Sequence, residues 1–191
     1  MSHLGEATGK LSLRSQEWIQ TALFQLMEKK PYSLISITEI ADKAGLARQT
    51  VYRNFQDKDE ILLNYLTRLM SGVWKHIDGG QPYTEAMFVL LFRTWKDNIP
   101  PSLILNIKGQ DRKIRQLIFR SICDCHDELF IGGSRGESGT KSDIYRLYGQ
   151  KSFSALLHMM LIEWTLQEFH LSPEEIGKVV SELSASMRKF L

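Results

Sequence analysis

The sequence has little cysteine and no long apolar run. Its two cysteines, Cys123 and Cys125, are separated by one residue, which is too close for a comfortable disulfide, so the fold should not depend on one and a reducing setting is expected. The longest apolar run, residues 155–162, is far shorter than the roughly 20 residues that a membrane helix needs. The N-terminal stretch lacks the apolar core of a signal peptide. These absences predict a cytoplasmic protein with no membrane partner.

Charge of one sign does not dominate either, because 24 basic and 22 acidic residues give a formal net charge of +2. Such a balance neither requires nor excludes a nucleic-acid partner, since a local basic patch can bind DNA on a nearly neutral molecule. The hydrophobic fraction of 43% is ordinary for a globular protein, and a chain of 191 residues can bury enough apolar surface to fold without staples.

Period-two alternation is also missing, whereas helical spacing of apolar residues runs through almost the whole sequence. The predicted fold class is therefore all-α. Ser36 with Glu39, and Ser172 with Glu175, form capping-box patterns at two helix starts, and Gly45 marks a helix end. A helix over 15–30 and two short helices on either side of Gly45 are expected first, followed by helices at 59–78, 83–97, 101–107, 111–130, 142–169 and 173–190.

The stretch AGLARQTVYRNF, residues 44–55, can bury few side chains yet is rich in outward hydrogen-bond donors. Together with the short helix and the tight turn before it, this stretch predicts a helix-turn-helix motif. The second helix of such a motif places its N-terminal face in the DNA major groove. Between residues 43 and 58, four basic residues stand against one acidic residue. Arg48 and Gln49 suit bidentate contacts with guanine and adenine, and the methyl group of Thr50 suits thymine.

The residues further round this helix have more than one possible role. Tyr52, Arg53 and Asn54 suit contacts with phosphates or with a flanking base. Tyr52 could instead pack the small three-helix core together with Phe55, and Arg53 could be a solvated surface charge.

The stretch ITEIADKAGLARQTVYRNFQDKDEIL resembles the DNA-binding signature of TetR-type transcriptional regulators. Ala47 departs from the serine that is usual there, and Gln49 from a frequent glycine. The residues that carry the likeness are Ile40–Ala41, Ala44–Gly45, Thr50–Val51–Tyr52, Phe55 and Lys58, within a wider match from Trp18 to Leu62. The resemblance implies an all-helical homodimer on a near-palindromic DNA operator, with phosphate contacts from Ser36, Thr38, Tyr52, Asn54 and Lys58.

The expected domain organisation has three parts. Residues 1–11 form a flexible arm, 12–58 a helix-turn-helix DNA-binding domain, and 59–191 a larger helical ligand-binding and dimerisation domain. The helix over 59–78 connects the last two, and GGQP at 79–82 is a candidate boundary between two domains. IGGSRGESGTKSD, residues 131–143, is expected to be a loop.

The resemblance also assigns roles to the C-terminal helices, which dimerise in this family, and to the middle helices, which enclose an effector pocket. The apolar faces over 142–169 and 173–190 suit a four-helix dimer bundle, but the same residues could be intrachain core. Residues 148–176 partly resemble the subgroup related to regulators of dihydroxyacetone kinase operons. The dimer candidates are Phe153, Leu157, Met160, Leu161, Trp164, Val180, Leu183 and Met187. The pocket candidates, for which core packing is the alternative, are Phe88, Phe92, Trp95, His126, His158 and Trp164.

Two sequence motifs are typical of a catalytic site and of a metal site, but neither has the structural surroundings that such a site requires. GGSRG, residues 132–136, fits the G-x-S-x-G nucleophile pattern but follows no strand. In CDCH, residues 123–126, Cys123 and His126 can share a helix face, yet a metal site needs further ligands. No catalytic residue, metal site or cofactor is predicted.

The predicted function is a ligand-responsive repressor that binds its DNA operator as a homodimer, with a small-molecule effector that the sequence does not identify. Activation stays open, because the sign of regulation depends on where the operator lies. A co-regulator that acts through a partner protein is the alternative from another class, and an enzyme is a distant third.

Overall fold

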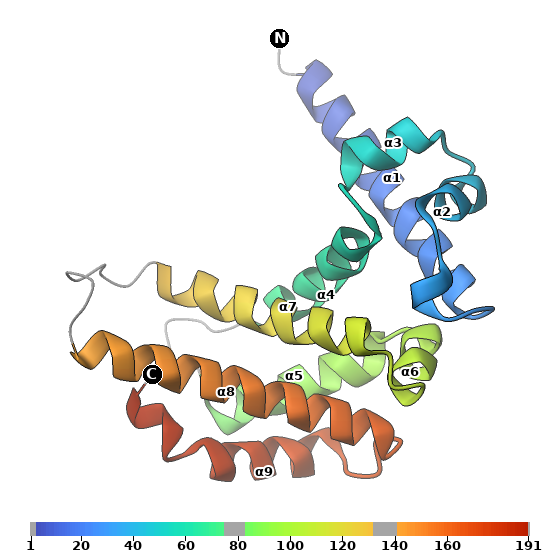
Figure 1. The fold of residues 1–191 in the computed structure, drawn as a ribbon. Helices are drawn as coiled ribbons and strands as arrows, with labels where there is room; N and C mark the ends of the chain where they lie inside the picture. Colours follow the sequence, from blue (N-terminus) through green and yellow to red (C-terminus); the bar gives the residue numbers. More distant parts are fainter. Residues whose placement is uncertain (1–2, 75–82, 132–140, 191) are drawn as a thin grey trace. The chain divides into compact units, whose positions relative to one another are not determined.

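The computed structural model describes residues 3–74, 83–131 and 141–190, and all regular structure in these ranges is helical. The all-α prediction is therefore confirmed (Figure 1). The predicted break at 79–82 and the GGSRG motif lie outside the described residues. The α-helices are α1 (His3–Met27), α2 (Ile37–Ala44), α3 (Arg48–Asn54), α4 (Lys58–Trp74), α5 (Glu85–Asn98), α6 (Pro101–Lys108), α7 (Arg112–Ile131), α8 (Lys141–Leu166) and α9 (Pro173–Ser184), with short 3-10 helices η1 (Tyr32–Leu34) and η2 (Met187–Phe190).

Local signals account for several helix ends. The Ser36 and Ser172 side chains each accept a hydrogen bond from the backbone N–H three residues on, and both capping boxes are complete. Gly45 ends α2 in the left-handed region at φ 66°, where a glycine is favoured. Helix α1 begins at His3, well before residue 15, because apolar spacing marks only where a helix packs.

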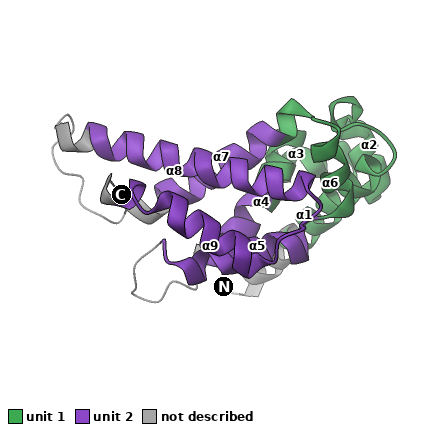
Figure 2. Cartoon of the chain, turned by 90° about the horizontal axis from the view of Figure 1, so that it is seen from below, with its two compact units in different colours: residues 1–65, 100–114 green, residues 66–99, 115–191 purple. Residues whose placement is uncertain are grey.

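The chain divides into two compact units (Figure 2). The first contains residues 1–65 and 100–114, so α6 groups with the first helices although α5 precedes it in sequence. Within this unit α1 contacts α2, α3 and α6, and α2 contacts α3. The core of the first unit includes Ile19, Leu23, Tyr32, Ile40, Val51 and Ile61, none of which is exposed.

The second unit contains residues 66–99 and 115–191, and its closest helix pair is α5 with α9. Gly177 permits this approach, because a Cβ there would stand 2.7 Å from Val89 Cγ2 and 2.8 Å from the Val89 backbone nitrogen. Aromatic side chains fill the core of this unit, with Phe88, Phe92, Trp95 and Phe153 fully buried. None of the described helices has the length and apolar character needed to cross a membrane.

Candidate nucleic-acid interface

Helices α2 and α3 and the turn between them form the helix-turn-helix. The N–H of Leu46 donates to the Ala41 carbonyl at 3.0 Å, which closes the end of α2 around Gly45. Ile40, Ala41 and Val51 are fully buried and pack the two helices together. Because its core contacts pass through so few side chains, α3 keeps most of its surface for other partners.

The outer face of α3 carries the residues that were predicted to read DNA. Arg48, Gln49, Tyr52 and Arg53 are exposed, with 57% of Tyr52 accessible. Phe55 is only 3% exposed, so the alternative of core packing holds for Phe55 and not for Tyr52.

Thr50 and Asn54 are half-buried and connected within the helix. Asn54 Nδ2 donates to the Thr50 carbonyl at 2.7 Å, and Arg53 Nη2 donates to Thr50 Oγ1 at 3.2 Å. Ala47 precedes the helix and provides no side-chain cap, as its replacement of the usual serine implies. Arg53 and Asn54 are therefore both tied to Thr50, one through its hydroxyl and the other through its backbone, on one side of α3.

The N-terminus of α2 carries two of the five residues for which a phosphate contact was expected, Ser36 and Thr38. Ser36 Oγ donates to Glu39 Oε2 at 2.8 Å and accepts from the Glu39 N–H at 3.3 Å. Lys30 Nζ lies 2.5 Å from Glu39 Oε1, and this contact, with the hydrogen bonds from Ser36, lowers the pKa of Glu39 to about 2. The Ser36 hydroxyl is thus engaged within the chain, whereas Thr38 is half-buried on the first turn of α2.

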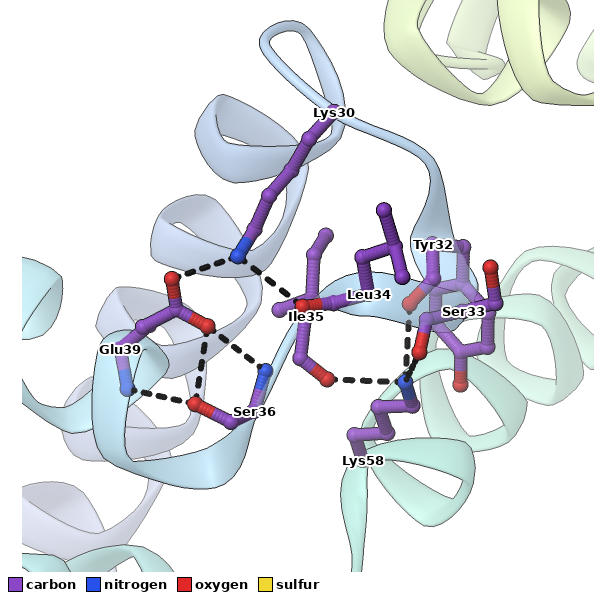
Figure 3. Close-up of polar contacts among 8 residues, drawn as sticks. All are labelled: Lys30, Tyr32, Ser33, Leu34, Ile35, Ser36, Glu39 and Lys58. Carbon is purple, nitrogen blue, oxygen red and sulfur yellow. Dashed lines mark hydrogen bonds and ion pairs between the residues drawn. The ribbon is translucent and has the colours of Figure 1, made fainter.

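Lys58, the remaining predicted phosphate contact, has a set of partners that the sequence did not reveal. Its Nζ donates to the carbonyls of Tyr32 and Ile35 at 2.8 Å and of Ser33 at 3.2 Å (Figure 3). It also lies 4.7 Å from the centroid of the Tyr32 ring. Burial lowers the pKa of this ammonium group.

Tyr32 and Asn106 support the same region and were missed by the sequence reasoning. Tyr32 is fully buried, its Oη donates to Asp59 Oδ1 at 2.6 Å, and its N–H donates to Asn106 Oδ1 at 3.0 Å. Asn106 Nδ2 donates in turn to the carbonyls of Met27 at 3.3 Å and Ser102 at 2.8 Å. A lone asparagine in the apolar helix α6 was the available signal, because a buried amide is retained where it finds hydrogen-bond partners.

The predicted pocket residues all lie in the second unit. Phe88, Phe92, Trp95, His126 and Trp164 are buried, and His158 is half-buried. His126 Nε2 lies 2.9 Å from Tyr83 Oη and its Nδ1 3.2 Å from Ser154 Oγ, while burial lowers the pKa of His126 to about 4. Among the described residues, His158 Nε2 is a buried atom with no hydrogen-bond partner.

The predicted dimer residues divide between the core and the surface. Phe153, Leu157, Leu161, Trp164 and Val180 are at most 2% exposed in the single chain, which agrees with intrachain core, the alternative that the sequence left open for them. Met160 and Met187 are half-buried and Leu183 is 51% exposed. The exposed apolar side chains on these helices are Ile144, Tyr145, Leu147, Tyr148 and Met159 of α8 and Val179 and Leu183 of α9.

The described residues include no group of His, Cys, Asp and Glu side chains that could hold a metal ion. Cys123 and Cys125 are both buried on α7. A buried free cysteine behaves as a small apolar side chain, so both thiols are suited to the core of the second unit.

Comparisons with known proteins identify the fold. The family model described as bacterial regulatory proteins, tetR family, matches residues 19–65. An uncharacterized HTH-type transcriptional regulator of Haemophilus influenzae is 30% identical, and the match spans 58% of this chain and 58% of that relative.

Two solved structures are similar over almost the whole chain. A TetR transcriptional regulator from Streptococcus agalactiae has a TM-score of 0.60 at 14% identity, covering 94% of this chain and 98% of that one. The dihydroxyacetone kinase operon activator DhaS has a TM-score of 0.54 at 20% identity, and the match covers 92% of this chain and 96% of that one. The family model thus covers the helix-turn-helix, and the fold of the family extends through the remaining helices. Residues 19–65 therefore match the helix-turn-helix region of the tetR family of bacterial regulatory proteins, and the chain as a whole shares the fold of a TetR transcriptional regulator.

Proposed function

We propose that the protein is a transcriptional regulator that binds a near-palindromic DNA operator as a homodimer and is released from it by a small effector. The observation that carries this proposal is the exposed polar face of α3. Arg48, Gln49, Tyr52 and Arg53 are exposed and not needed for the core, yet they stand together on a helix that is fixed by its buried Val51. A short helix presented in this way suits the major groove.

Each side chain of this face has a role suited to its chemistry. Arg48 and Gln49 read guanine and adenine by paired hydrogen bonds, and Thr50 contributes its methyl group. Phosphate contacts come from the flanking side chains and from the start of α2, which set the register of the protein on DNA without specifying sequence. These flanking residues are Tyr52, Arg53, Asn54, Ser36 and Thr38.

The homodimer is proposed to form through the exposed apolar residues of α8 and α9. Ile144, Tyr148 and Met159 share one face of α8, and Val179 and Leu183 are one turn apart on α9. Large apolar side chains exposed on two helices suit a two-fold interface in which the same surface occurs on both subunits. Such a dimer would place two copies of α3 in successive major grooves about 34–36 Å apart.

Release by an effector is supported by a buried polar atom in the second unit. His158 Nε2 has no hydrogen-bond partner within the part of the chain that the structure describes, so it is an anchor that a hydrogen-bonding ligand can use. Repression is the proposed outcome of operator binding. DhaS is named an activator, so activation is the alternative, and the position of the operator decides between them.

The test is selection of bound duplexes from a random DNA library at near-physiological salt. The wild-type protein should enrich an inverted repeat with half-sites one helical turn apart. Arg48→Ala should weaken binding by about 1–3 kcal/mol and relax one base position in each half-site. Lys178→Ala, a change of an exposed cation on α9, is the matched control and should leave the motif intact.

Met159→Glu should break the dimer and reduce the enriched motif to a single half-site, because a carboxylate would be buried in the seam. Recovery of no motif by the folded wild-type dimer would contradict the proposal. The co-regulator alternative would then be preferred.

A further inference from the structure

The turn before α2, residues 32–35, is held by two lysine side chains. Lys58 Nζ donates to the carbonyls of Tyr32, Ser33 and Ile35, and Lys30 Nζ donates to the carbonyl between them, that of Leu34, at 2.9 Å. Four successive carbonyls therefore face ammonium groups (Figure 3). Lys58 approaches from the start of α4, 23–26 residues away in sequence.

The Lys58 ammonium group has no N–H left for a DNA phosphate while these bonds are made. A lysine ammonium carries three N–H donors, and three carbonyls lie within 3.2 Å of Nζ. Its place over the Tyr32 ring adds a favourable cation–π contact. A phosphate contact would have to release at least one of these three carbonyls.

The turn continues directly into the end of α2 that is proposed to meet DNA. Ile35, the last residue of the turn, precedes the N-cap Ser36, and Thr38 follows on the first turn. Lys30 bonds both the Leu34 carbonyl and Glu39, whose carboxylate completes the capping box around Ser36. The position of the turn thus sets where the first turn of α2 begins and in which direction it points.

We propose that Lys58 is a positioning residue, which places the N-terminus of α2 for DNA binding by holding the carbonyls of residues 32–35, and that it is not a phosphate contact. The inference rests on the proposed DNA-binding function and names how that surface is held.

Other bonds keep the fold when Lys58 is removed. Tyr32 stays anchored by its buried ring, by Asp59 and by Asn106. The remainder of the turn, residues 33–35, loses the ammonium group that joins it to the start of α4. Loss of Lys58 should therefore displace the start of α2 within a folded protein.

The first experiment measures the affinity for the selected operator as a function of salt. Removing a side chain that pairs with one phosphate reduces the slope of log K against log salt by about 0.9, because fewer counterions are released on binding. Arg53→Ala, which removes a proposed phosphate partner, should show this reduced slope. Lys58→Ala should weaken binding about tenfold or more with the wild-type slope retained.

The second experiment restores the missing ammonium group from solution. Propylammonium chloride supplies the atoms that Lys58→Ala lacks and should recover affinity for this variant but not for Arg53→Ala. Tetramethylammonium chloride at the same concentration has no N–H donor and should recover neither. Lys58→Arg keeps the charge but presents a planar fork in place of three convergent donors, so it should bind as weakly as Lys58→Ala.

Two results would overturn the inference alone: a reduced salt slope in Lys58→Ala, or wild-type affinity in Lys58→Arg. If Lys58→Ala does not fold at 25 °C by circular dichroism, Lys58→Gln replaces it and the salt slope decides in the same way. A folded wild-type protein that shows no sequence-specific binding would overturn the proposed function and this inference with it.

Discussion

The two units hold their helices in place by different means. In the first unit, α2 and α3 are only 8 and 7 residues long, and directional polar bonds fix the turn between α1 and α2. In the second unit, α8 is 26 residues long and aromatic side chains pack between longer helices. Short helices bury little apolar area, so hydrogen bonds add to the packing that positions them, whereas long helices are positioned mainly by packing. The surface proposed to bind DNA is built on the first arrangement.

The largest expected difference between the units appears on acidification. His126 is 1% exposed in the second unit, and burial lowers its pKa from 6.5 to about 4. Below pH 6.5 His126 binds a proton in the unfolded chain but not in the folded chain. The free energy of unfolding therefore decreases as the pH falls from 6.5, and the decrease ends near pH 4. The expected loss is about 3 kcal/mol.

Urea unfolding at several pH values between 7.5 and 4 measures this loss. His126→Gln, which does not titrate, should remove most of the dependence, leaving the contribution of His158, whose pKa burial also lowers. The Lys30–Glu39 pair of the first unit should stay intact in this range, because the lowered pKa of Glu39 confines its loss to between pH 4.5 and about 2. A wild-type stability that is flat from pH 6.5 to 4.5 would contradict the buried neutral His126.

A side chain added at Gly177 should disrupt the packing of the second unit most directly. An added Cβ would meet both the side chain and the backbone of Val89, so Gly177→Ala should lower the free energy of unfolding by about 1–3 kcal/mol. Gly72→Ala on α4 is the matched control, since nothing lies within 4 Å of its added Cβ. It should raise stability by about 0.5–1 kcal/mol through helix propensity. If both substitutions changed the free energy of unfolding by the same amount, Gly177 of α9 would not lie in such close contact with Val89 of α5.

The features that were predictable from sequence depend on neighbouring residues. The capping boxes at Ser36 and Ser172 and the left-handed Gly45 involve groups at most four residues apart, so the sequence pattern contains all of their parts. The partners of Lys58 lie 23–26 residues away and are backbone carbonyls, which any residue could supply. No sequence pattern could identify them.

The sequence left two roles open for the dimer candidates, dimer seam or intrachain core, for a related reason. Helix α8 carries large apolar side chains on more than one face, with Leu157 buried and Met159 half exposed. Apolar spacing shows that such a helix packs but does not distinguish the face that meets its own chain from the face left for a partner.

The two capping boxes provide a matched pair, one in each unit. Ser36→Ala and Ser172→Ala should each lower stability by about 1 kcal/mol, because each leaves the backbone N–H of Glu39 or Glu175 without its side-chain acceptor. Only Ser36→Ala should also weaken operator binding, since α2 meets DNA in the proposed function. Thermal unfolding and operator titration of the same two variants separate these effects. A decrease in operator affinity in Ser172→Ala alone would reverse the assignment of the units.

The smallest expected effect is a coupling energy. If Lys58 positions the start of α2, then its removal already displaces Thr38, and Thr38→Ala should cost less in the Lys58→Ala background than in the wild type. A double-mutant cycle on operator affinity should give a coupling of about 0.5 kcal/mol or more for this pair, although the two side chains belong to different helices. Arg48 stands on the other helix of the motif, so Lys58→Ala with Arg48→Ala should add to within about 0.3–0.5 kcal/mol. Additivity in both cycles would show that Lys58 acts on DNA independently of α2. Equal coupling in both would instead show that the lysine holds the whole helix-turn-helix, so the two cycles together set how far from residues 32–35 its influence extends.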